Sequence, residues 1–399
     1  MAFQKTGQQS MWIQTVRTFM EDHHVESELK NETEQLPWNI RQASGKAGLI
    51  GLDIALEDGG AGLSALTMGH LYEECGRYGL NTREVIGAGH GNMIAKFGNA
   101  DQKKRYLPRL MSGDLLVGVG LTEPGTGSDL AKTQTFARKE GSNYILNGEK
   151  EFVSRVNEAG VFIVFAQTNT EAGARGLTAF IVDMDRPGVE KYNLEPMGLK
   201  GWSYGGFRLH DVVVPASNRL GEEGEGFKIF NTHFGYWRVL MGIICVGSAQ
   251  RAIEQAIDYS KERQAFGGPI GRFQSVMHKI SESATKLEAA RLLSFKALDY
   301  LDKGHSNVME ASMAKWYSTT VAYEAIDHAL QIHGARGYVI DYGLEQRLRD
   351  VRGLQIADGS TDTLKSLIGR DLMGKEIYDA MLGRTAKPKP AEKELEFAG

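Results

Sequence analysis

The stretch GVGLTEPGTGSDL, residues 118–130, carries the most information about the fold of this chain. Pro124 fixes one backbone angle and has no N–H, whereas Gly127 lacks the Cβ atom that would keep a flat heterocyclic ligand away from the main chain. Thr122 and Ser128 place hydroxyl groups beside these backbone amides. The same residue types also favour an ordinary solvated turn, so this stretch alone leaves both interpretations open.

The composition is that of an ordinary globular protein. Of the 399 residues, 42% are hydrophobic and 24% are charged, which is enough for two or three structural units with substantial cores. The 46 basic and 50 acidic residues give a formal net charge of −4. No bulk attraction to nucleic acid or to an anionic membrane follows from this balance. The longest apolar runs, such as residues 239–246, are far shorter than a membrane span, so we expect neither partner.

The cysteines indicate a reducing compartment, and neither the cysteines nor the histidines indicate a metal site. Cys75 and Cys245 give neither a disulfide framework nor the spacing of zinc ligands, and we expect both in the core. The N-terminal residues lack a basic segment followed by an apolar one, so we expect a cytoplasmic protein. Six histidines show no metal-ligand spacing with carboxylates or cysteines: His23, His24, His90, His233, His278 and His333.

The pattern of apolar residues divides the chain into four parts. Residues 1–115 have helical spacing and predict an N-terminal α-helical domain, and residues 116–226 contain short apolar runs that predict a middle β domain. Helical spacing returns in residues 227–385, which predict a C-terminal α-helical domain. Residues 386–399 combine proline with charge and predict a flexible tail. The fold class is therefore α+β, mostly α.

Individual elements can be placed more closely. Asp101 is expected to cap the helix that carries residues 102–110. A long helix is expected to present an apolar stripe made of Leu287, Ala290, Leu293, Ala297 and Leu301. Strands are expected at residues 144–146, 161–167, 177–182 and 207–214.

Three further stretches carry unusual residue combinations. NYILNGEKEFVSRVNEAG, residues 143–160, contains an aromatic-x-hydroxyl element at Phe152 and Ser154. RQAFG begins at Arg263 and is followed by Gln274, and a guanidinium offers a planar fork of donors suited to a pyrophosphate. The longest stretch, QIHGARGYVIDYGLEQRLRDVRGLQIADGSTDTL, covers residues 331–364.

These four stretches, in this order, resemble the FAD-dependent acyl-CoA dehydrogenase family, and the resemblance covers the chain up to its tail. It implies a helical N-terminal bundle, a middle β-barrel domain and a C-terminal four-helix bundle. By resemblance Ser154 donates to the flavin N5 region, and Phe152 packs on the flavin ring unless it is a plain core aromatic. The implied FAD contacts are Thr122, Gly127, Ser128, Phe152, Ser154, Arg263, Phe266, Gln274, Gln331, Gly334, Ser360 and Asp362.

The resemblance also implies a subunit arrangement and a base. In the family the arginine matching Arg263 reaches the FAD of a neighbouring subunit, so we expect a homo-oligomer, either a tetramer or a dimer. Asp358 stands where the family has a catalytic glutamate, and it would take the α-proton of an acyl thioester. Its side chain is one methylene shorter, and a misplacement of about 1 Å can cost about a hundredfold in rate. The implied substrate contacts are Ser128, Trp237, Arg238 and Gly359.

Several positions depart from the family pattern. Some family members place their base where this chain has Trp237, which cannot abstract a proton. Trp202, Tyr204 and Gly235 replace residues that are usually small hydroxyl residues or aspartate near the substrate. These changes indicate either an unusual or carrier-bound acyl group or simple repacking of the core. Arg349 and Asp350 are expected to form an ion pair at the protein surface.

The leading functional expectation is FAD-dependent α,β-dehydrogenation of an acyl thioester, with electrons leaving to an electron-transfer flavoprotein. The first alternative keeps the flavin but changes the reaction to that of a reductase or an oxygenase acting on a carrier-protein-bound or unusual acyl thioester. The second alternative is a non-catalytic flavoprotein that serves as a scaffold or a subunit partner.

Overall fold

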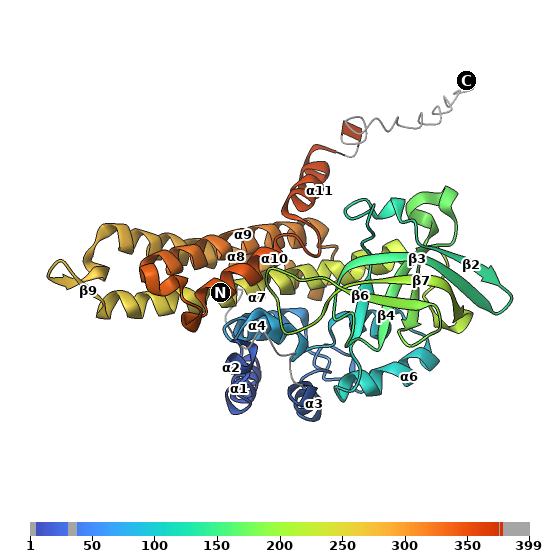
Figure 1. Cartoon of the computed structure of the whole chain (residues 1–399), viewed down its shortest axis with the longest axis horizontal. Coiled ribbons are helices and arrows are strands. Elements are labelled where there is room, and N and C mark those ends of the chain that lie inside the picture. The colour runs from blue at the N-terminus through green and yellow to red at the C-terminus, as the bar shows by residue number, and fades with distance from the viewer. Residues whose placement is uncertain (1–4, 31–37, 375, 378–399) are drawn as a thin grey trace, which may run out of the picture.

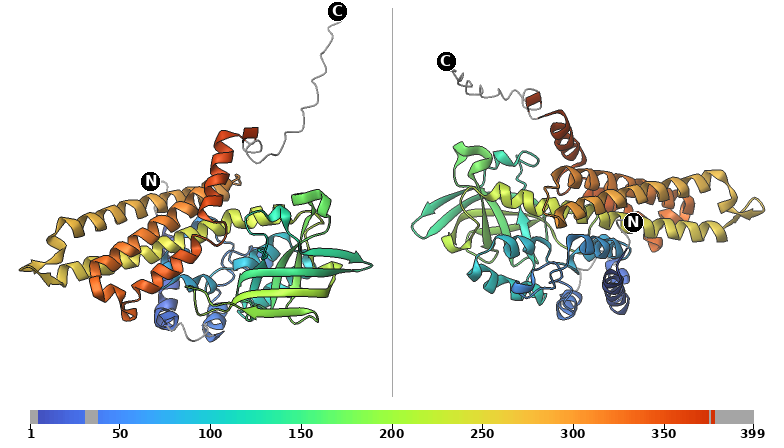
Figure 2. Two further views of the ribbon diagram at one scale, coloured as in Figure 1. Left: turned by 45° about the horizontal axis from the view of Figure 1, so that its top comes forward. Right: turned by 180° about the vertical axis from the view of Figure 1, so that it is seen from behind.

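The computed structural model describes residues 5–30, 38–374 and 376–377. An N-terminal helical unit, a twisted sheet and a long helical bundle follow one another along the chain (Figure 1). The bundle extends away from the sheet as an elongated arm in both other views (Figure 2). This arrangement confirms the predicted α+β, mostly α fold class. The tail predicted at residues 386–399 lies outside the described residues.

The N-terminal unit contains short helices whose ends follow ordinary capping chemistry. Asn99 caps α6: its side chain accepts from the Gln102 amide at 2.9 Å, and the Gln102 side chain accepts from the Asn99 amide at 3.0 Å. The cap predicted at Asp101 is therefore wrong, because asparagine caps as well as aspartate and Gln102 completes the reciprocal pair. The helices are α1 (Gly7–Asp22), α2 (Val25–Lys30), α3 (Trp38–Lys46), α4 (Ala65–Gly76), α5 (Asn92–Phe97) and α6 (Ala100–Met111).

The middle of the chain forms a sheet. Among the described residues it has eight strands in the order β6-β7-β3-β2-β4-β5-β8, with β1 parallel to β4. The long strands β3 and β7 pair antiparallel with two register shifts, the second between Glu151 and Val153. All four predicted strands are confirmed. The bounds are β1 (Val117–Gly120), β2 (Phe136–Glu140), β3 (Asn143–Ser154), β4 (Val161–Gln167), β5 (Leu177–Asp183), β6 (Val189–Asn193), β7 (Tyr204–Pro215) and β8 (Arg219–Leu220).

The C-terminal bundle is built on one long, largely buried helix, α7, against which α8, α9 and α10 pack. A small hairpin of β9 and β10 joins α7 to α8 at the end of the bundle farthest from the sheet (Figure 1). On α8 the predicted stripe faces inward, with Leu287, Ala290 and Ala297 buried and its two other leucines half-buried. The bounds are α7 (Gly226–Glu262), β9 (Gln264–Ala265), β10 (Gly268–Pro269), α8 (Gln274–Asp302), α9 (Val308–His333), α10 (Leu344–Leu354) and α11 (Thr361–Met373).

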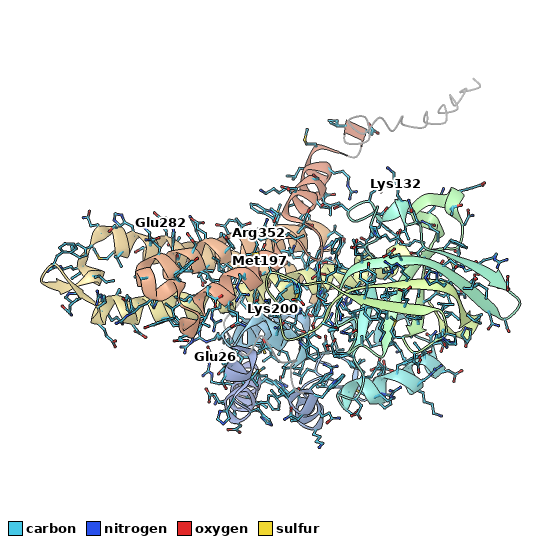
Figure 3. The ribbon with its side chains drawn as sticks, in the orientation of Figure 1. Glu26, Lys132, Met197, Lys200, Glu282 and Arg352 are labelled. Carbon is cyan, nitrogen blue, oxygen red and sulfur yellow. The ribbon has the colours of Figure 1, made fainter. Side chains whose placement is uncertain are left out.

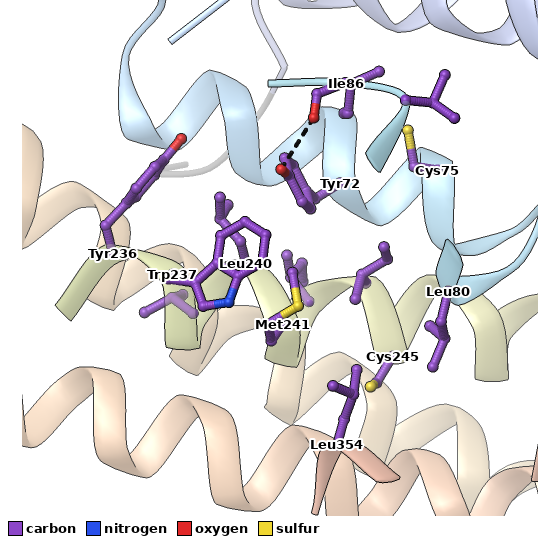
Figure 4. Packing of buried hydrophobic residues seen from close by; sticks show 14 of the residues in the cluster. Tyr72, Cys75, Leu80, Ile86, Tyr236, Trp237, Leu240, Met241, Cys245 and Leu354 are labelled. Atoms are coloured by element: carbon purple, nitrogen blue, oxygen red, sulfur yellow. Dashed lines mark hydrogen bonds between the residues drawn. The ribbon is translucent and has the colours of Figure 1, made fainter. Parts of the chain in front are cut away.

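Helices α4 and α7 approach each other closely through two glycines. A Cβ atom added at Gly76 would lie 2.0 Å from the Ile244 carbonyl oxygen, and one added at Gly247 would lie 1.9 Å from the Glu73 carbonyl oxygen. Figure 4 shows Tyr72 of α4 beside Trp237 of α7 in this core. The two cysteines predicted to lie in the core, Cys75 and Cys245, are buried and unpaired.

None of the helices in the described part of the chain is both long enough and apolar enough to cross a membrane.

The close contact of α4 and α7 predicts a strong effect of one added methyl group. Gly247→Ala forces the two helices apart, and we expect it to lower the free energy of unfolding by about 2–3 kcal/mol. Gly369→Ala on α11 is the matched control, because no atom lies within 4 Å of its added Cβ. For Gly369→Ala, helix propensity predicts a rise in the free energy of unfolding of up to about 1 kcal/mol. Urea unfolding followed by circular dichroism measures both, and a Gly247→Ala midpoint equal to that of wild type contradicts the account.

Candidate active site

Asp358 lies on the turn that joins α10 to α11. Its φ angle is 58° and that of Gly359 is 101°, so two consecutive residues occupy the left-handed region. Glycine accepts this region freely, and aspartate tolerates it better than most residues because its short polar side chain can bond locally. Asp358 is half-buried, and its backbone N–H has no acceptor within the described residues. The turn therefore presents a carboxylate and a free amide side by side.

Two buried cations hold the backbone of this turn. Lys315 on α9 donates from Nζ to the carbonyl oxygens of Ala357 at 2.7 Å and Gly359 at 2.6 Å. Arg238 on α7 donates from Nε to the carbonyl oxygen of Asp358 at 2.7 Å. Burial lowers the pKa of Lys315 to about 8 and that of Arg238 to about 10, while the Asp358 charge opposes both shifts. Three consecutive carbonyl groups are thus bound by side chains from two helices.

Trp237 orients the carboxylate of Asp358. Its Nε1 donates to Oδ2 at 3.1 Å, and its buried ring meets Tyr72 edge-on at 6.2 Å between centroids. Figure 4 shows both rings in the core between α4 and α7. An indole N–H cannot accept a proton, so Trp237 can position a base but cannot act as one. Trp237 and Arg238 both contact the turn, and their direct contact with substrate stays a prediction.

A buried histidine pair lies behind Trp237. His90 Nδ1 and His233 Nε2 are 3.0 Å apart, and the His233 ring stacks on Trp237 at 6.0 Å and 16°. One ring has to donate and the other accept, so this hydrogen bond requires at least one neutral ring. Burial lowers the pKa of His90 to about 4 and that of His233 well below its usual value. In the described residues no group of three or more histidine, cysteine or acidic side chains could hold a metal ion.

The loop that follows β1, residues 121–130, is pinned to the sheet by Glu123. Its carboxylate accepts from the backbone N–H groups of Gln134 at 2.7 Å and Thr135 at 3.0 Å, and from Lys150 Nζ at 2.8 Å. Lys150 also donates to the Leu121 carbonyl oxygen at 3.0 Å. Burial lowers the pKa of Lys150 to about 8, with the Glu123 charge opposing the shift. The solvated-turn interpretation of this loop is therefore too simple, because a buried ion pair fixes its start.

The surface beside this loop fits a flat ring system. In the described residues, the hydroxyls of Thr122 and Ser154 have no hydrogen-bond partner. A Cβ added at Gly127 would meet only Thr122 Cγ2, at 4.0 Å, so packing within the chain does not require glycine there. Phe152 is 53% exposed with a φ angle of 57°, so it is not a core aromatic. An uncovered aromatic ring, free hydroxyls and an open glycine are what contact with the isoalloxazine of FAD needs.

The start of α11 adjoins the same loop. Thr363 Oγ1 donates to Ser128 Oγ at 2.9 Å, and Ser360 caps α11 by accepting from the Thr363 amide at 3.3 Å. Asp362 is exposed in the first helical turn. The structure thus brings the loop, the end of β3 and the Asp358 turn together, although the cofactor contacts of Ser360 and Asp362 stay predictions.

The remaining predicted FAD contacts lie at the opposite end of the bundle. Arg238 and Glu262 are 24 residues apart on α7, which corresponds to about 36 Å at ~1.5 Å per residue. The hairpin after Glu262 and the short helix after α9 form this far end (Figure 1). The predicted contacts there are exposed: Arg263, Phe266, Gln274, Gln331 and Gly334. A single chain does not bring the two groups of predicted FAD contacts together.

Two expectations change with the structure. Asp350 is buried and accepts from the Leu199 amide at 2.5 Å, so its predicted place at the surface is wrong. The segment after β6 crosses the bundle there, with Met197 and Lys200 beside the helices in Figure 3. At Gly235 an added Cβ would lie 2.8 Å from Asn307 Oδ1, which favours repacking over an altered substrate contact. Asn307 also donates to the Gly235 carbonyl oxygen at 2.8 Å.

Several buried charged residues were not selected from the sequence. Lys315 had one usable signal, since it interrupts a run of small and apolar residues on α9. The others had none, because each is an ordinary charged residue whose partners come from distant segments: Arg41, Arg83, Glu84, Glu123, Lys150 and Arg155.

Comparison with known proteins gives the same family for all three parts of the chain between residues 6 and 373. Family models described as the N-terminal, middle and C-terminal domains of acyl-CoA dehydrogenase match residues 6–114, 118–212 and 224–373. An acyl-CoA dehydrogenase of Bacillus subtilis (strain 168) is 35% identical over 377 residues, which cover 92% of this chain and 99% of that protein. The caffeyl-CoA reductase-Etf complex subunit CarC of Acetobacterium woodii is 32% identical over 376 residues, with 92% and 99% covered. The solved structure of the prolyl acyl carrier protein oxidase AnaB matches with a TM-score of 0.88 at 31% identity, with 92% and 100% covered.

The histidine pair predicts how stability depends on acid. Both rings are neutral in the folded protein, and unfolding exposes them at their ordinary pKa of 6.5. The unfolded state therefore binds more protons between pH 6.5 and about 4, and the free energy of unfolding falls as pH falls through that window. Each ring contributes about 1.4 kcal/mol per pH unit, so His233→Gln should make the decline shallower by that amount.

Urea unfolding across this pH window measures the slope. His278→Gln is the control, because this exposed side chain on α8 lies outside the buried pair. Parallel declines for wild type and His233→Gln contradict the neutral buried pair.

Proposed function

We propose that this chain, which belongs to the acyl-CoA dehydrogenase family and is an FAD-dependent oxidoreductase, removes hydrogen from the α and β carbons of an acyl thioester with Asp358 as base. The observation that carries this proposal is the turn itself, where a carboxylate oriented by Trp237 stands beside a free backbone N–H. When bound, FAD supplies the acceptor for the β-hydrogen as hydride.

The chain's own residues handle the proton and the developing charge. Asp358 takes the α-proton on its carboxylate. Its backbone N–H donates to the thioester oxygen, where negative charge builds up as the proton leaves. One such donor contributes about 2.7–4 kcal/mol of barrier lowering in comparable sites. Arg238 and Lys315 keep this amide in place, because they bind the carbonyl groups on either side of it.

The flavin site is proposed to combine two copies of the chain. Thr122, Ser154 and Phe152 would hold the ring system from one copy, and the Arg263 end of the bundle would hold the pyrophosphate and adenosine from another. This far end also exposes large apolar side chains, with Phe266 90% and Tyr338 83% exposed. Exposed apolar clusters of this kind mark interaction surfaces, which supports a homo-oligomer, as a dimer or tetramer.

An electron-transfer flavoprotein is the proposed acceptor of the electrons. Support comes from the similarity to a caffeyl-CoA reductase-Etf complex subunit, since that protein is named as part of such an assembly. The cytoplasm stays the proposed location, supported by two free buried thiols that need no oxidising compartment.

A carrier-bound thioester is the second candidate substrate. The similarity to a prolyl acyl carrier protein oxidase favours it, as does the placement of Trp202 and Tyr204. Trp202 is buried, and Tyr204 lies beside Phe152 with 6.4 Å between ring centroids. Flavin bleaching by an acyl group on a pantetheinylated carrier protein, but by none on CoA, would select this candidate.

Anaerobic titration with acyl-CoAs tests the base. We expect wild type to lose its visible flavin absorbance with one acyl class, and Asp358→Asn to bleach about 10²–10⁴ times more slowly. Trp237→Phe keeps an aromatic ring but loses the hydrogen bond to Asp358 Oδ2, so flavin bleaching should slow about tenfold or more. Trp12→Phe on α1 is the matched control and should bleach at the wild-type rate. Wild-type bleaching by Asp358→Asn would rule out Asp358 as the base.

Subunit complementation tests the composite flavin site. Arg263→Ala damages the far end and Asp358→Asn damages the base, so a hybrid of the two contains one site with neither change. Random pairing in co-expressed protein should restore about a quarter of the wild-type activity. Ser154→Ala mixed with Asp358→Asn is the control: both changes lie at the same end, so every hybrid site carries one of them. Absence of recovery in purified Arg263→Ala and Asp358→Asn hybrids contradicts the composite site.

A further inference from the structure

Three buried rings pack around the indole of Trp237. His233 lies about one helical turn earlier on α7 and stacks on the indole, at 16° and 6.0 Å between centroids. His90 on the short helix η3 (Gly89–Gly91) lies 4.9 Å away, and Tyr72 on α4 meets the indole edge-on at 6.2 Å. All four side chains are buried. Because the rings come from three different elements, the rotamer of the indole depends on how these elements are held together.

Hydrogen bonds join these rings to the segment of residues 86–92. The Tyr72 hydroxyl donates to the Ile86 carbonyl oxygen at 3.2 Å (Figure 4). His90 Nδ1 lies 3.0 Å from His233 Nε2. This second bond links η3 to α7, and both of its rings contact the indole.

Asp53 fixes the same segment against α7. Its Oδ1 accepts from the Ala88 amide at 2.8 Å, and its Oδ2 accepts from Asn92 Nδ2 at 2.8 Å and from the Tyr236 hydroxyl at 3.2 Å. Tyr236 directly precedes Trp237. One carboxylate therefore binds the chain on both sides of η3 and also the residue before the indole. This contact keeps η3 close enough to α7 for the histidine pair to form.

The carboxylate of Asp358 depends on the indole for its direction. In the part of the chain that the structure describes, the carboxylate oxygens accept one hydrogen bond, from Trp237 Nε1 at 3.1 Å. Lys315 and Arg238 bind carbonyl oxygens of the turn, which fixes the backbone but leaves the side-chain torsions of Asp358 free. A rotated indole would take its N–H away from Oδ2, and the carboxylate could then turn away from the substrate.

We propose that His90 and His233 are positioning residues for the base: their hydrogen bond holds the rings that fix the indole of Trp237, and the indole directs the carboxylate of Asp358. The inference rests on the proposed function, in which that carboxylate takes the α-proton. Burial lowers the pKa of His90 to about 4 and that of His233 well below its usual value, so the pair is neutral at pH 7. It therefore orients the carboxylate without a nearby positive charge that would weaken the base.

Packing alone does not account for two histidines at these positions. Two phenylalanines would fill nearly the same space without burying polar nitrogens, and replacing both partners of a buried hydrogen bond by apolar groups of similar shape can be neutral or stabilising. The double variant His90→Phe/His233→Phe therefore keeps both rings and removes the bond. Urea unfolding at pH 7 should show a free energy of unfolding no lower than that of wild type.

Exchange of the α-proton measures the effect on the base. FAD-loaded double variant is incubated in D₂O with butyryl-, valeryl- and hexanoyl-CoA, and deuterium at the α carbon is followed by mass spectrometry. At saturating thioester we expect exchange about tenfold slower than in wild type, whereas the concentration that gives half-maximal exchange should change by less than about twofold. Exchange at the wild-type rate by the folded double variant overturns the proposal.

A second background shows whether the pair acts through the indole. In Trp237→Phe the N–H is already gone, so the two phenylalanine changes should alter the exchange rate by less than about twofold. His70→Phe is the matched control: this buried histidine on α4 packs on Phe295 at 4.3 Å, and its ring nitrogens bind no other described residue. It should exchange at the parent rate in both backgrounds. Equal losses from the double change in both backgrounds would assign the histidines a merely structural role and overturn the proposal.

Fluorine NMR separates this inference from the proposed function, because it needs no turnover. The chain has five tryptophans, and in protein labelled with 5-fluorotryptophan the Trp237 signal is the one lost in Trp237→Phe. We expect this signal to shift or split in the double variant and to stay in place in His70→Phe. A displaced signal with no deuterium exchange by wild type would support the positioning of the indole and contradict the dehydrogenation. An undisplaced signal, with exchange by wild type, would support the dehydrogenation and overturn the positioning role.

Discussion

The contact between Lys315 and the backbone on both sides of Asp358 is the constraint on which the site depends. A buried ammonium with two carbonyl acceptors, joined by Arg238 on the carbonyl between them, holds two residues in the left-handed region. The packing of α7 against α9 sets where these cations stand, so the bundle core determines the direction of the carboxylate and of its amide. Trp237 adds the final restraint by binding one carboxylate oxygen. An aspartate can therefore occupy this position in a defined orientation, although its side chain is shorter than that of glutamate.

The length of α7 gives the fold a second property. One end of this 37-residue helix supports the Asp358 turn, and the other supports the hairpin that contains Phe266. The residues that are predicted to contact one FAD molecule therefore lie near opposite ends of α7. In the proposed assembly, a second copy brings the two ends together, so cofactor binding and subunit association are one event. The exposed aromatic residues at the far end are then interface residues, and the exposed Phe152 is a cofactor contact.

Local patterns allowed much of the fold to be predicted from the sequence. The four strands and the α8 stripe follow from apolar spacing. The cofactor contacts of the hydroxyls and glycines, which come from motif resemblance, stay predictions. The cap of α6 was misplaced by two residues, because Asn99 and Asp101 are both good caps and only Asn99 has Gln102 at the right spacing. The burial of Arg83 and Arg155 could not be predicted, because the carboxylate that both contact joins segments that are far apart in sequence. Lys315 carried one local signal, the small and apolar residues around it on α9, but the backbone groups that it binds are also distant in sequence. For Gly235 the sequence left a changed substrate contact and simple repacking both open, and its close contact with Asn307 favours repacking.

Proton transfer at the α carbon tests the central claim, that Asp358 held on this turn is the base. FAD-loaded protein is incubated in D₂O with butyryl-, valeryl- and hexanoyl-CoA, without an electron acceptor, and deuterium at the α carbon is followed by mass spectrometry. The account predicts incorporation by wild type with at least one of them, and incorporation slower by about a hundredfold or more with Asp358→Asn. Deuterium incorporation by Asp358→Asn at the wild-type rate would contradict the account.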